Sequence, residues 1–180
     1  MRKAMTMVLL VAACGGQSGP EEAAAPAQEA VMSATATVRD SAGAVLGTLA
    51  LSQEGGGVRL VGRLDGLTAG EHGMHIHTIG QCAPTFDAAG SHWNPTGRQH
   101  GTRNPEGPHF GDLGNVMADA TQGAQVDATT PGGRLDGPDG VLDADGAAVV
   151  VHAMADDDST DPSGASGGRV ACGVIELKAP

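Results

Sequence analysis

The sequence predicts a small all-β domain. Its 180 residues suffice for one domain with a sizeable core and are too few for two comfortable ones. Glycine accounts for 29 residues, aromatic residues make up only 2%, and tyrosine is absent. The core must therefore be built from Val, Leu, Ile and Ala with many turns between short segments, a composition that favours strands over helices.

The chain begins with a segment typical of an export signal. Arg2 and Lys3 precede an apolar run from Met5 to Ala13, which is too short to span a bilayer as a permanent helix. We therefore predict a signal peptide over residues 1–13.

A cysteine follows this signal directly. Val11-Ala12-Ala13-Cys14 resembles a bacterial lipobox, in which the cysteine becomes the lipid-modified first residue of the mature protein. Gly15 after the cysteine is typical of outer-membrane lipoproteins, and residues 14–30 lack apolar periodicity, which predicts a flexible tether. The expected location is the bacterial cell envelope, facing the periplasm and anchored by lipid to the outer membrane. The alternative is an ordinary cleaved signal peptide with an incidental cysteine.

Cysteine count and charge limit the remaining options. A lipid on Cys14 leaves Cys82 and Cys172, a pair that an exported protein is expected to join in a disulfide. Without Arg2 and Lys3, 8 of the 10 basic residues remain against 21 acidic ones, a formal net charge of −13. That charge argues against nucleic acid as a partner.

From residue 31 onward, short apolar runs alternate with turn residues in the manner of antiparallel sheets. We expect residues 31–180 to form one domain. The expected strands are residues 34–39, 45–51, 58–64, 73–77, 113–117, 124–128, 146–152 and 169–177.

The strand over residues 73–77 carries two histidines on one face. Because strand side chains alternate, His75 and His77 share a face, roughly 7 Å apart, and Met74 and Ile76 share the other. That spacing suits a shared metal ion. A pair of solvated histidines is the alternative when the pattern is taken alone.

Two long loops interrupt the strand pattern. Residues 78–111 contain no expected strand or helix but carry Cys82, His92, His100 and His109. Residues 156–168 form a second polar loop. A loop as long as the first is typically functional in a compact domain.

The seven histidines all lie between residues 72 and 152, outside the signal and the tether. Imidazole suits copper and zinc, and a carboxylate among imidazoles suits zinc. Asp112, three residues after His109, is the natural carboxylate. The histidines therefore predict a site for one or both metals.

The order of these motifs is similar to that of the copper/zinc superoxide dismutases. Gly73-Met74-His75-Ile76-His77 resembles the family's copper-binding strand, and Ser91-His92-Trp93-Asn94-Pro95 resembles its bridging-histidine turn. The segments 100–101, 109–115, 151–152, 155–157 and 168–175 match in the same order. The similarity covers residues 31–177.

The resemblance implies two metal sites that share one histidine. Copper would be held by His75, His77, His92 and His152. Zinc would be held by His92, His100, His109 and Asp112.

The resemblance also implies roles around the ligands. His72 would pack and hydrogen-bond behind the copper strand, and Asp156 would link a copper histidine to a zinc histidine. Arg169 would attract a small anion beside the open copper position. A Cys82–Cys172 disulfide would clip the first loop to the last strand and close about ninety residues, for an estimated ~4–5 kcal/mol. Taken alone, the acidic run 156–158 and a single arginine are ordinary solvated groups.

Fold and function follow from the same resemblance. It implies an eight-stranded antiparallel Greek-key barrel or flattened sandwich with two long functional loops. The implied enzyme converts superoxide to dioxygen and hydrogen peroxide, with copper as the redox metal, zinc in a structural role, and His92 and Arg169 as catalytic residues. One superoxide is oxidised and a second is reduced, while His92 takes up a proton. Both monomers and homodimers occur in the family.

Three other functions compete with this one. Loss of a copper ligand or of Arg169 would favour a metal store or delivery domain without turnover, but every matched position is filled. A copper-only variant would lack the zinc set, and His100, His109 and Asp112 argue against it. A purely structural sandwich leaves the histidines unexplained.

The sequence departs from the family in its charges. Many members carry basic residues in the loop before the arginine, whereas residues 156–168 contain none and have four aspartates. We expect weaker steering of the anion unless Arg98, Arg103 or Arg134 face the copper channel.

Overall fold

The computed structural model describes residues 32–178, so the predicted signal peptide, the tether and Cys14 lie outside the described residues. The described strands are β1 (Ser33–Asp40), β2 (Val45–Glu54), β3 (Gly57–Asp65), β4 (Gly70–His77), β5 (Asp112–Ala118), β6 (Gly123–Thr129), β7 (Ala148–His152) and β8 (Arg169–Leu177). One short 3-10 helix, η1 (Phe86–Ala89), lies between β4 and β5. Within residues 32–178, no helix is long and apolar enough to cross a membrane.

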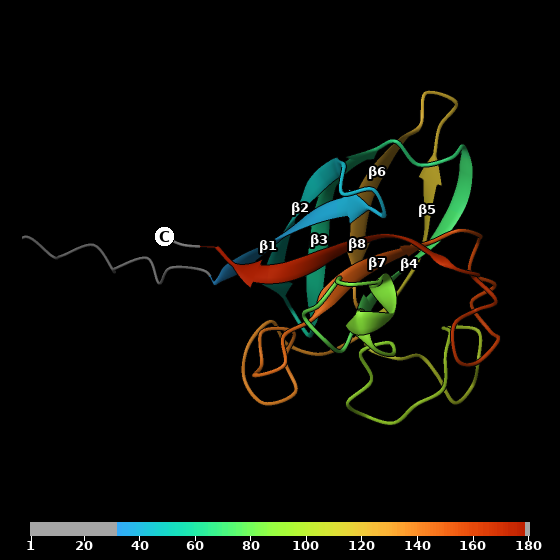
Figure 1. Cartoon of the computed structure of the whole chain (residues 1–180). Coiled ribbons are helices and arrows are strands. Elements are labelled where there is room, and N and C mark those ends of the chain that lie inside the picture. Colours follow the sequence, from blue (N-terminus) through green and yellow to red (C-terminus); the bar gives the residue numbers. More distant parts are fainter. Residues whose placement is uncertain (1–31, 179–180) are drawn as a thin grey trace, which may run out of the picture. The chain divides into compact units, whose positions relative to one another are not determined.

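The eight strands close into one antiparallel barrel (Figure 1). Their order around the barrel is β1-β2-β3-β6-β5-β4-β7-β8, and β8 pairs with β1 to complete it. β3 therefore neighbours β6, and β4 neighbours β7, so the chain crosses the barrel ends twice instead of meandering. The predicted all-β, eight-stranded antiparallel barrel is confirmed.

The sequence also predicted most strand limits to within a few residues. Two predictions need correction, one for the start of a strand and one for a loop. The seventh strand begins at Ala148 instead of Gly146, because Gly146 has a φ of 64° and its N–H closes a turn onto the Asp143 carbonyl. The loop 78–111, expected to lack any helix, contains η1. Ala89, the last residue of this single turn, is fully buried, a packing contact that the local sequence does not reveal.

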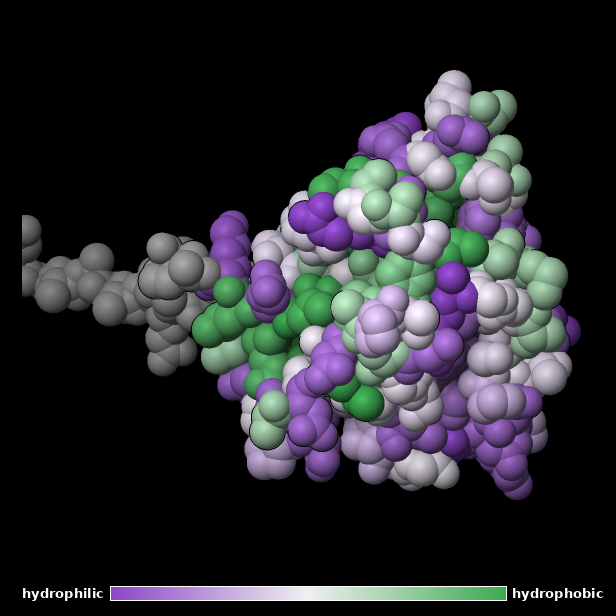
Figure 2. Space-filling view, viewed as in Figure 1, coloured by the Kyte–Doolittle hydropathy of each residue, from purple (hydrophilic) through white to green (hydrophobic). Residues whose placement is uncertain are grey.

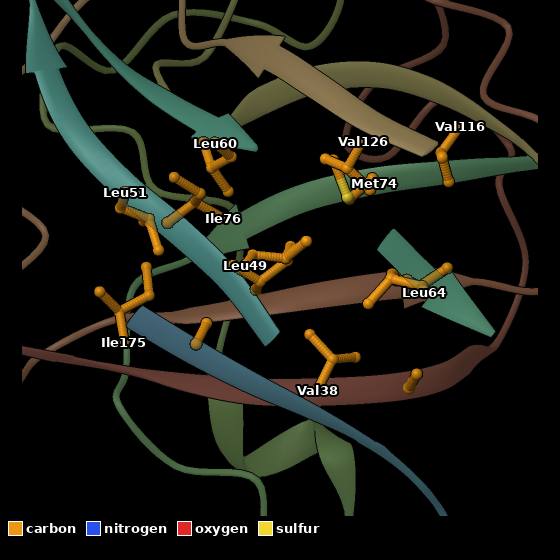
Figure 3. Close-up of a cluster of buried hydrophobic side chains, with 14 of the residues drawn as sticks. Val38, Leu49, Leu51, Leu60, Leu64, Met74, Ile76, Val116, Val126 and Ile175 are labelled. Atoms are coloured by element: carbon orange, nitrogen blue, oxygen red, sulfur yellow. The ribbon is translucent and has the colours of Figure 1, made fainter. Parts of the chain in front are cut away.

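The barrel interior is filled by aliphatic side chains from alternating strand positions. In β1, Ala34, Ala36 and Val38 are buried while the threonines between them are not. Figure 3 shows the larger side chains converging from different strands, among them Leu49 of β2 and Ile76 of β4. Burying one leucine contributes about 2 kcal/mol, so this core supports the rigid frame on which the loops are mounted.

β4 is buried on both faces. Met74 and Ile76 point into the barrel core, as expected from strand alternation. His75 and His77 lie on the opposite face, where both are fully enclosed by the loops. The histidine face is therefore a second, polar interior between the barrel wall and the long loops.

The surface differs between the two ends of this view. Figure 2 shows hydrophobic residues gathered where β1 begins and β8 ends, and mostly hydrophilic or neutral residues over the loops. The loops thus bury the histidines beneath a polar exterior.

Candidate metal centre

Four buried histidines from three elements face one point. His75 and His77 come from β4, His152 ends β7, and His92 is brought from the long loop by a β-bridge to His77. One ring nitrogen on each lies within 4.8 Å of those of the others. This is the set that the sequence predicted for copper.

The free nitrogens of this set have no partner in the described protein. They are His75 Nδ1, His77 Nε2, His92 Nε2 and His152 Nε2, all fully shielded from solvent. A buried polar atom without a partner typically costs about 1–3 kcal/mol, so four together call for a ligand. A cation that accepts imidazole nitrogen fits this set, and copper is such an ion.

The opposite ring nitrogens explain why the free ones converge. His75 Nε2 donates to Asp156 Oδ2 (2.7 Å), His77 Nδ1 to the Gly90 carbonyl (2.9 Å), and His152 Nδ1 to the Gly167 carbonyl (3.0 Å). Each bond fixes the tautomer and turns the lone pair of the other nitrogen inward.

Burial keeps these histidines neutral. Desolvation lowers the pKa of His75 to about 3 and that of His77 to about 2, and it also lowers the pKa of His92 and His152. Neutral imidazole is the form that binds metal. The site is therefore ready to accept a cation at neutral pH.

A second set of donors surrounds Asp112. Its Oδ1 lies 3.0 Å from His92 Nδ1, 3.0 Å from His100 Nδ1 and 3.3 Å from His109 Nδ1. The Nδ1 atoms of His92 and His109 are 3.4 Å apart. A tetrahedral zinc ion with bonds of about 2.0 Å separates its ligand atoms by about 3.3 Å. The donor set and its spacing fit zinc.

His75 also lies close to this second set. One of its nitrogens is within 4.8 Å of the donors of His92, His100 and Asp112, a grouping that omits His109. We favour His109 as the fourth member, because His75 Nε2 is already bonded to Asp156, whereas His109 Nδ1 points at Asp112 Oδ1.

Charge around Asp112 supports an anionic carboxylate. Burial would raise its pKa, but hydrogen bonds from His100, His109 and His92 outweigh burial and hold the pKa well below its usual range. Burial would likewise lower the pKa of His100, but its contacts with Asp112 and Asp156 raise that pKa to about 10. The metal-free site thus holds a proton that a cation would replace.

Asp156 contacts a histidine of each set. Its Oδ2 accepts from His75 and its Oδ1 lies 2.9 Å from His100 Nε2. Asn115 bonds the backbone of Asp156 in both directions, at 2.7 and 2.8 Å. Gly164 packs directly over this carboxylate, where an added Cβ would lie 1.7 Å from Oδ1, so only glycine fits.

His72 lies beside the end of β7, behind the first set of histidines. Its Nδ1 bonds the carbonyl of His152 (2.7 Å) and its Nε2 that of Thr68 (2.8 Å). It therefore connects β4 to the end of β7 and is no part of either donor set.

Arg169 lines the small cavity above the first set. This cavity, of about 250 Å³, is also lined by His77, His92 and His152. The guanidinium donates to the carbonyls of Phe86 and Gly90, each at 2.6 Å, and burial lowers its pKa. Arg169 also lines a larger cavity of about 690 Å³, but no histidine lines that one.

Among the described residues, no Arg or Lys other than Arg169 lines the small cavity. Arg98 donates to the Gly107 carbonyl, Arg103 is absent from the lining, and Arg134 pairs with Asp136. The nearest charge to Arg169 is acidic, since Asp87 Oδ1 lies 3.9 Å from its Nε. The condition for strong steering is therefore not met.

The predicted disulfide is present. Cys82 and Cys172 are bonded, with 90 residues between them in sequence. The bond attaches η1 and its neighbours to β8, where Phe86 packs with Ala89 and Val150 in a small cluster outside the barrel. It thereby holds the two carbonyls that fix Arg169.

Reasoning from the sequence did not identify several groups that hold the ligands in position. The carbonyls of Gly90 and Gly167 carry no residue-type signal, and their role depends wholly on tertiary placement. Asp161, whose Oδ1 accepts from the His100 amide at 2.7 Å, was counted only as part of an acidic loop.

Comparison with known proteins shows the family to which the chain is related. Residues 45–175 match the family model of copper/zinc superoxide dismutase. The chain is 42% identical over 149 residues to a superoxide dismutase [Cu-Zn] of Caulobacter vibrioides, covering 80% of this chain and 86% of the relative. It is 36% identical over 155 residues to an extracellular superoxide dismutase [Cu-Zn] of Brugia pahangi, covering 81% and 76%.

A solved structure gives the same result. The crystal structure of a SOD-like protein from Bacillus subtilis is 34% identical, with a TM-score of 0.73 over 78% of this chain and 96% of that one. The family match, the relatives and the two donor sets agree, and the chain belongs to the copper/zinc superoxide dismutase family.

Proposed function

We propose that this chain converts superoxide to dioxygen and hydrogen peroxide at a copper ion bridged through His92 to a structural zinc ion. The observation that carries the proposal is that four unpartnered, buried imidazole nitrogens converge on one point. Beside them, three further imidazole nitrogens surround the Asp112 carboxylate. Copper is assigned to His75, His77, His92 and His152. Zinc is assigned to His92, His100, His109 and Asp112.

His92 is suited to serve both ions because its two nitrogens face different sets. Its Nε2 is one of the four unpartnered atoms, and its Nδ1 is 3.0 Å from Asp112. Copper, when bound, supplies the one-electron redox change that the reaction needs, whereas zinc supplies only positive charge. His92 can hold a proton at Nε2 in the state in which this nitrogen is unbound and pass it to the departing peroxide.

Arg169 binds the anion. Its two carbonyl bonds fix the guanidinium at the cavity wall, and its charge is the only basic one there among residues 32–178. The cavity of about 250 Å³, which three histidine rings also line, has room for a small diatomic anion beside Arg169.

The test is dismutation by the purified chain, with copper and zinc counted per chain and a His75→Ala variant measured beside it. The proposal expects about one ion of each metal and activity that the variant loses. Full metal loading without activity would instead favour a metal store or delivery protein.

We also propose that the protein acts in the bacterial cell envelope, with a lipid on Cys14 after removal of residues 1–13, a tether over 14–30 and the enzyme domain over 31–180. The Cys82–Cys172 disulfide supports an oxidising compartment. Mass spectrometry of membrane-fractionated protein should find diacylglycerol on Cys14, and a Cys14→Ser variant should leave the membrane. An unmodified, soluble mature chain would contradict the anchor. Analytical ultracentrifugation of the Cys14→Ser variant distinguishes monomer from homodimer.

A further inference from the structure

The acidic loop contains one aspartate whose position the proposed reaction does not explain. Asp161 lies at the far end of the run 156–161, and its carboxylate is about half exposed. Its Oδ1 accepts the backbone N–H of His100 at 2.7 Å and lies 3.8 Å from His109 Nε2. One carboxylate oxygen therefore faces two residues of the zinc set.

The outer nitrogens of the other histidines show what His109 lacks. Every other histidine that would bind a single metal has its outer nitrogen bonded to a fixed acceptor: Asp156 for His75 and His100, Gly90 for His77, and Gly167 for His152. His109 Nε2 makes no such bond to the described residues, and Asp161 is the acidic group facing it. Such outer acceptors fix ring orientation and raise ligand basicity.

We propose that Asp161 is the positioning carboxylate of the zinc site, which orients His109 through Nε2–H while it holds the His100 backbone. The inference rests on the proposed zinc site. Closing the contact needs a movement of about 1 Å, from 3.8 Å to ordinary hydrogen-bond length. His109 is held through Nδ1 once zinc binds, so Nε2 then carries the proton that Asp161 accepts.

The neighbours of Asp161 give this role a consequence for the cavity. Pro162 and Ser163, the next two residues, line the cavity above the copper set. Asp158 adds a second attachment, accepting the N–H of Thr102 at 2.8 Å. The acidic loop is thus fastened to the zinc ligands at the point where it forms the rim for the anion.

The test compares zinc binding of the full chain with that of Asp161→Asn and Asp161→Ala. Metal-free protein is titrated with Zn²⁺ against a chelator, and solvent exchange of the His109 Nε2–H is followed by NMR in the zinc-loaded form. Asp136→Asn is the matched control, because Asp136 is 46% exposed against 48% for Asp161 and pairs only with Arg134. Outer ligand partners are typically worth 10- to 100-fold in affinity.

We expect Asp161→Ala to weaken zinc binding by about tenfold, the lower end because the carboxylate is half exposed, and to speed the His109 proton exchange. Asp161→Asn should fall between, since it keeps the acceptor oxygen and loses the charge, and the control should match the wild type. Affinity within about twofold of wild type together with unchanged exchange in both variants would overturn the inference alone. Weaker binding with unchanged exchange would also overturn it, since Asp161 would then act only through the His100 backbone. A wild-type chain that takes up no zinc would overturn the proposed function and this inference with it.

Discussion

Replacing Asp156 by asparagine tests the link between the two metal sites with almost no change in shape. The carboxylate accepts three hydrogen bonds, from His75 Nε2 at Oδ2 and from His100 Nε2 and the Asp158 N–H at Oδ1. Asparagine has one acceptor oxygen and a donor amide in place of the other. Whichever way the amide turns, at least one buried N–H faces another donor.

The size of the effect follows from that count. A buried donor without an acceptor costs about 1–3 kcal/mol, which corresponds to roughly 5- to 150-fold in an equilibrium constant. That range agrees with the 10- to 100-fold that outer ligand partners typically contribute. We therefore expect Asp156→Asn to lower the affinity for at least one of the two metals by about 10- to 100-fold.

The assay is chelator competition on metal-free protein, performed separately with Zn²⁺ and Cu²⁺. Asp157→Asn is the control, because Asp157 is exposed and bonds only inside its own loop, to Ser159 and Thr160. If Asp156→Asn held both metals within about twofold of the wild-type affinities, the bridging role would be refuted.

Three further predictions follow from other parts of the molecule. Replacing both Cys82 and Cys172 by serine removes a crosslink that spans 90 residues, and should lower the free energy of unfolding by about 4–5 kcal/mol, measured by urea denaturation. A loss below about 1 kcal/mol would contradict the loop-entropy argument. The dismutation rate in stopped flow should stay level or rise as ionic strength increases from about 10 to 150 mM. The reason is that, among residues 32–178, Arg169 is the only Arg or Lys that lines the cavity, and this part of the chain carries 8 basic (Lys and Arg) against 18 acidic side chains. A several-fold fall in the rate would demonstrate net attraction of the anion. The metal-free protein should lose stability as pH falls below about 6.5, since the unfolded chain then binds protons that folded His75 and His77, with pKa values lowered to about 3 and about 2, do not. Each of these two histidines should cost about 1 kcal/mol between pH 7 and pH 5.5, and His100, whose pKa is raised to about 10, should return slightly less than one such contribution. Chemical denaturation should therefore show a net loss of at least about 1 kcal/mol at pH 5.5, and a gain in stability would contradict the burial of His75 and His77 as neutral rings.

Much of the barrel could be predicted because strand periodicity is a local property. Alternation of small apolar and polar residues located β1, and the two faces of β4 separated Met74 and Ile76 from His75 and His77. Turn η1 escaped prediction because a single turn leaves no periodic pattern, and the packing of Ala89 with residues of β7 and β8 is a long-range contact. Local sequence carries no record of that contact.

The donor residues could be assigned to two metal sites from the sequence because their order along the chain resembles one family's motifs. What holds them in orientation was less visible. The acceptors for His77 and His152 are backbone carbonyls, which any residue supplies. Asp161 was indistinguishable from its acidic neighbours until the fold placed it beside His100 and His109.

The most direct test of the central claim, that His92 bridges two different metals, is anomalous diffraction from crystals of the metal-loaded chain at the copper and zinc absorption edges. We predict two separate peaks on opposite sides of the His92 ring. The copper peak should lie among His75 Nδ1 and the Nε2 atoms of His77, His92 and His152, and the zinc peak among Asp112 and the Nδ1 atoms of His92, His100 and His109. A single peak, or two peaks that do not share His92, would contradict the account.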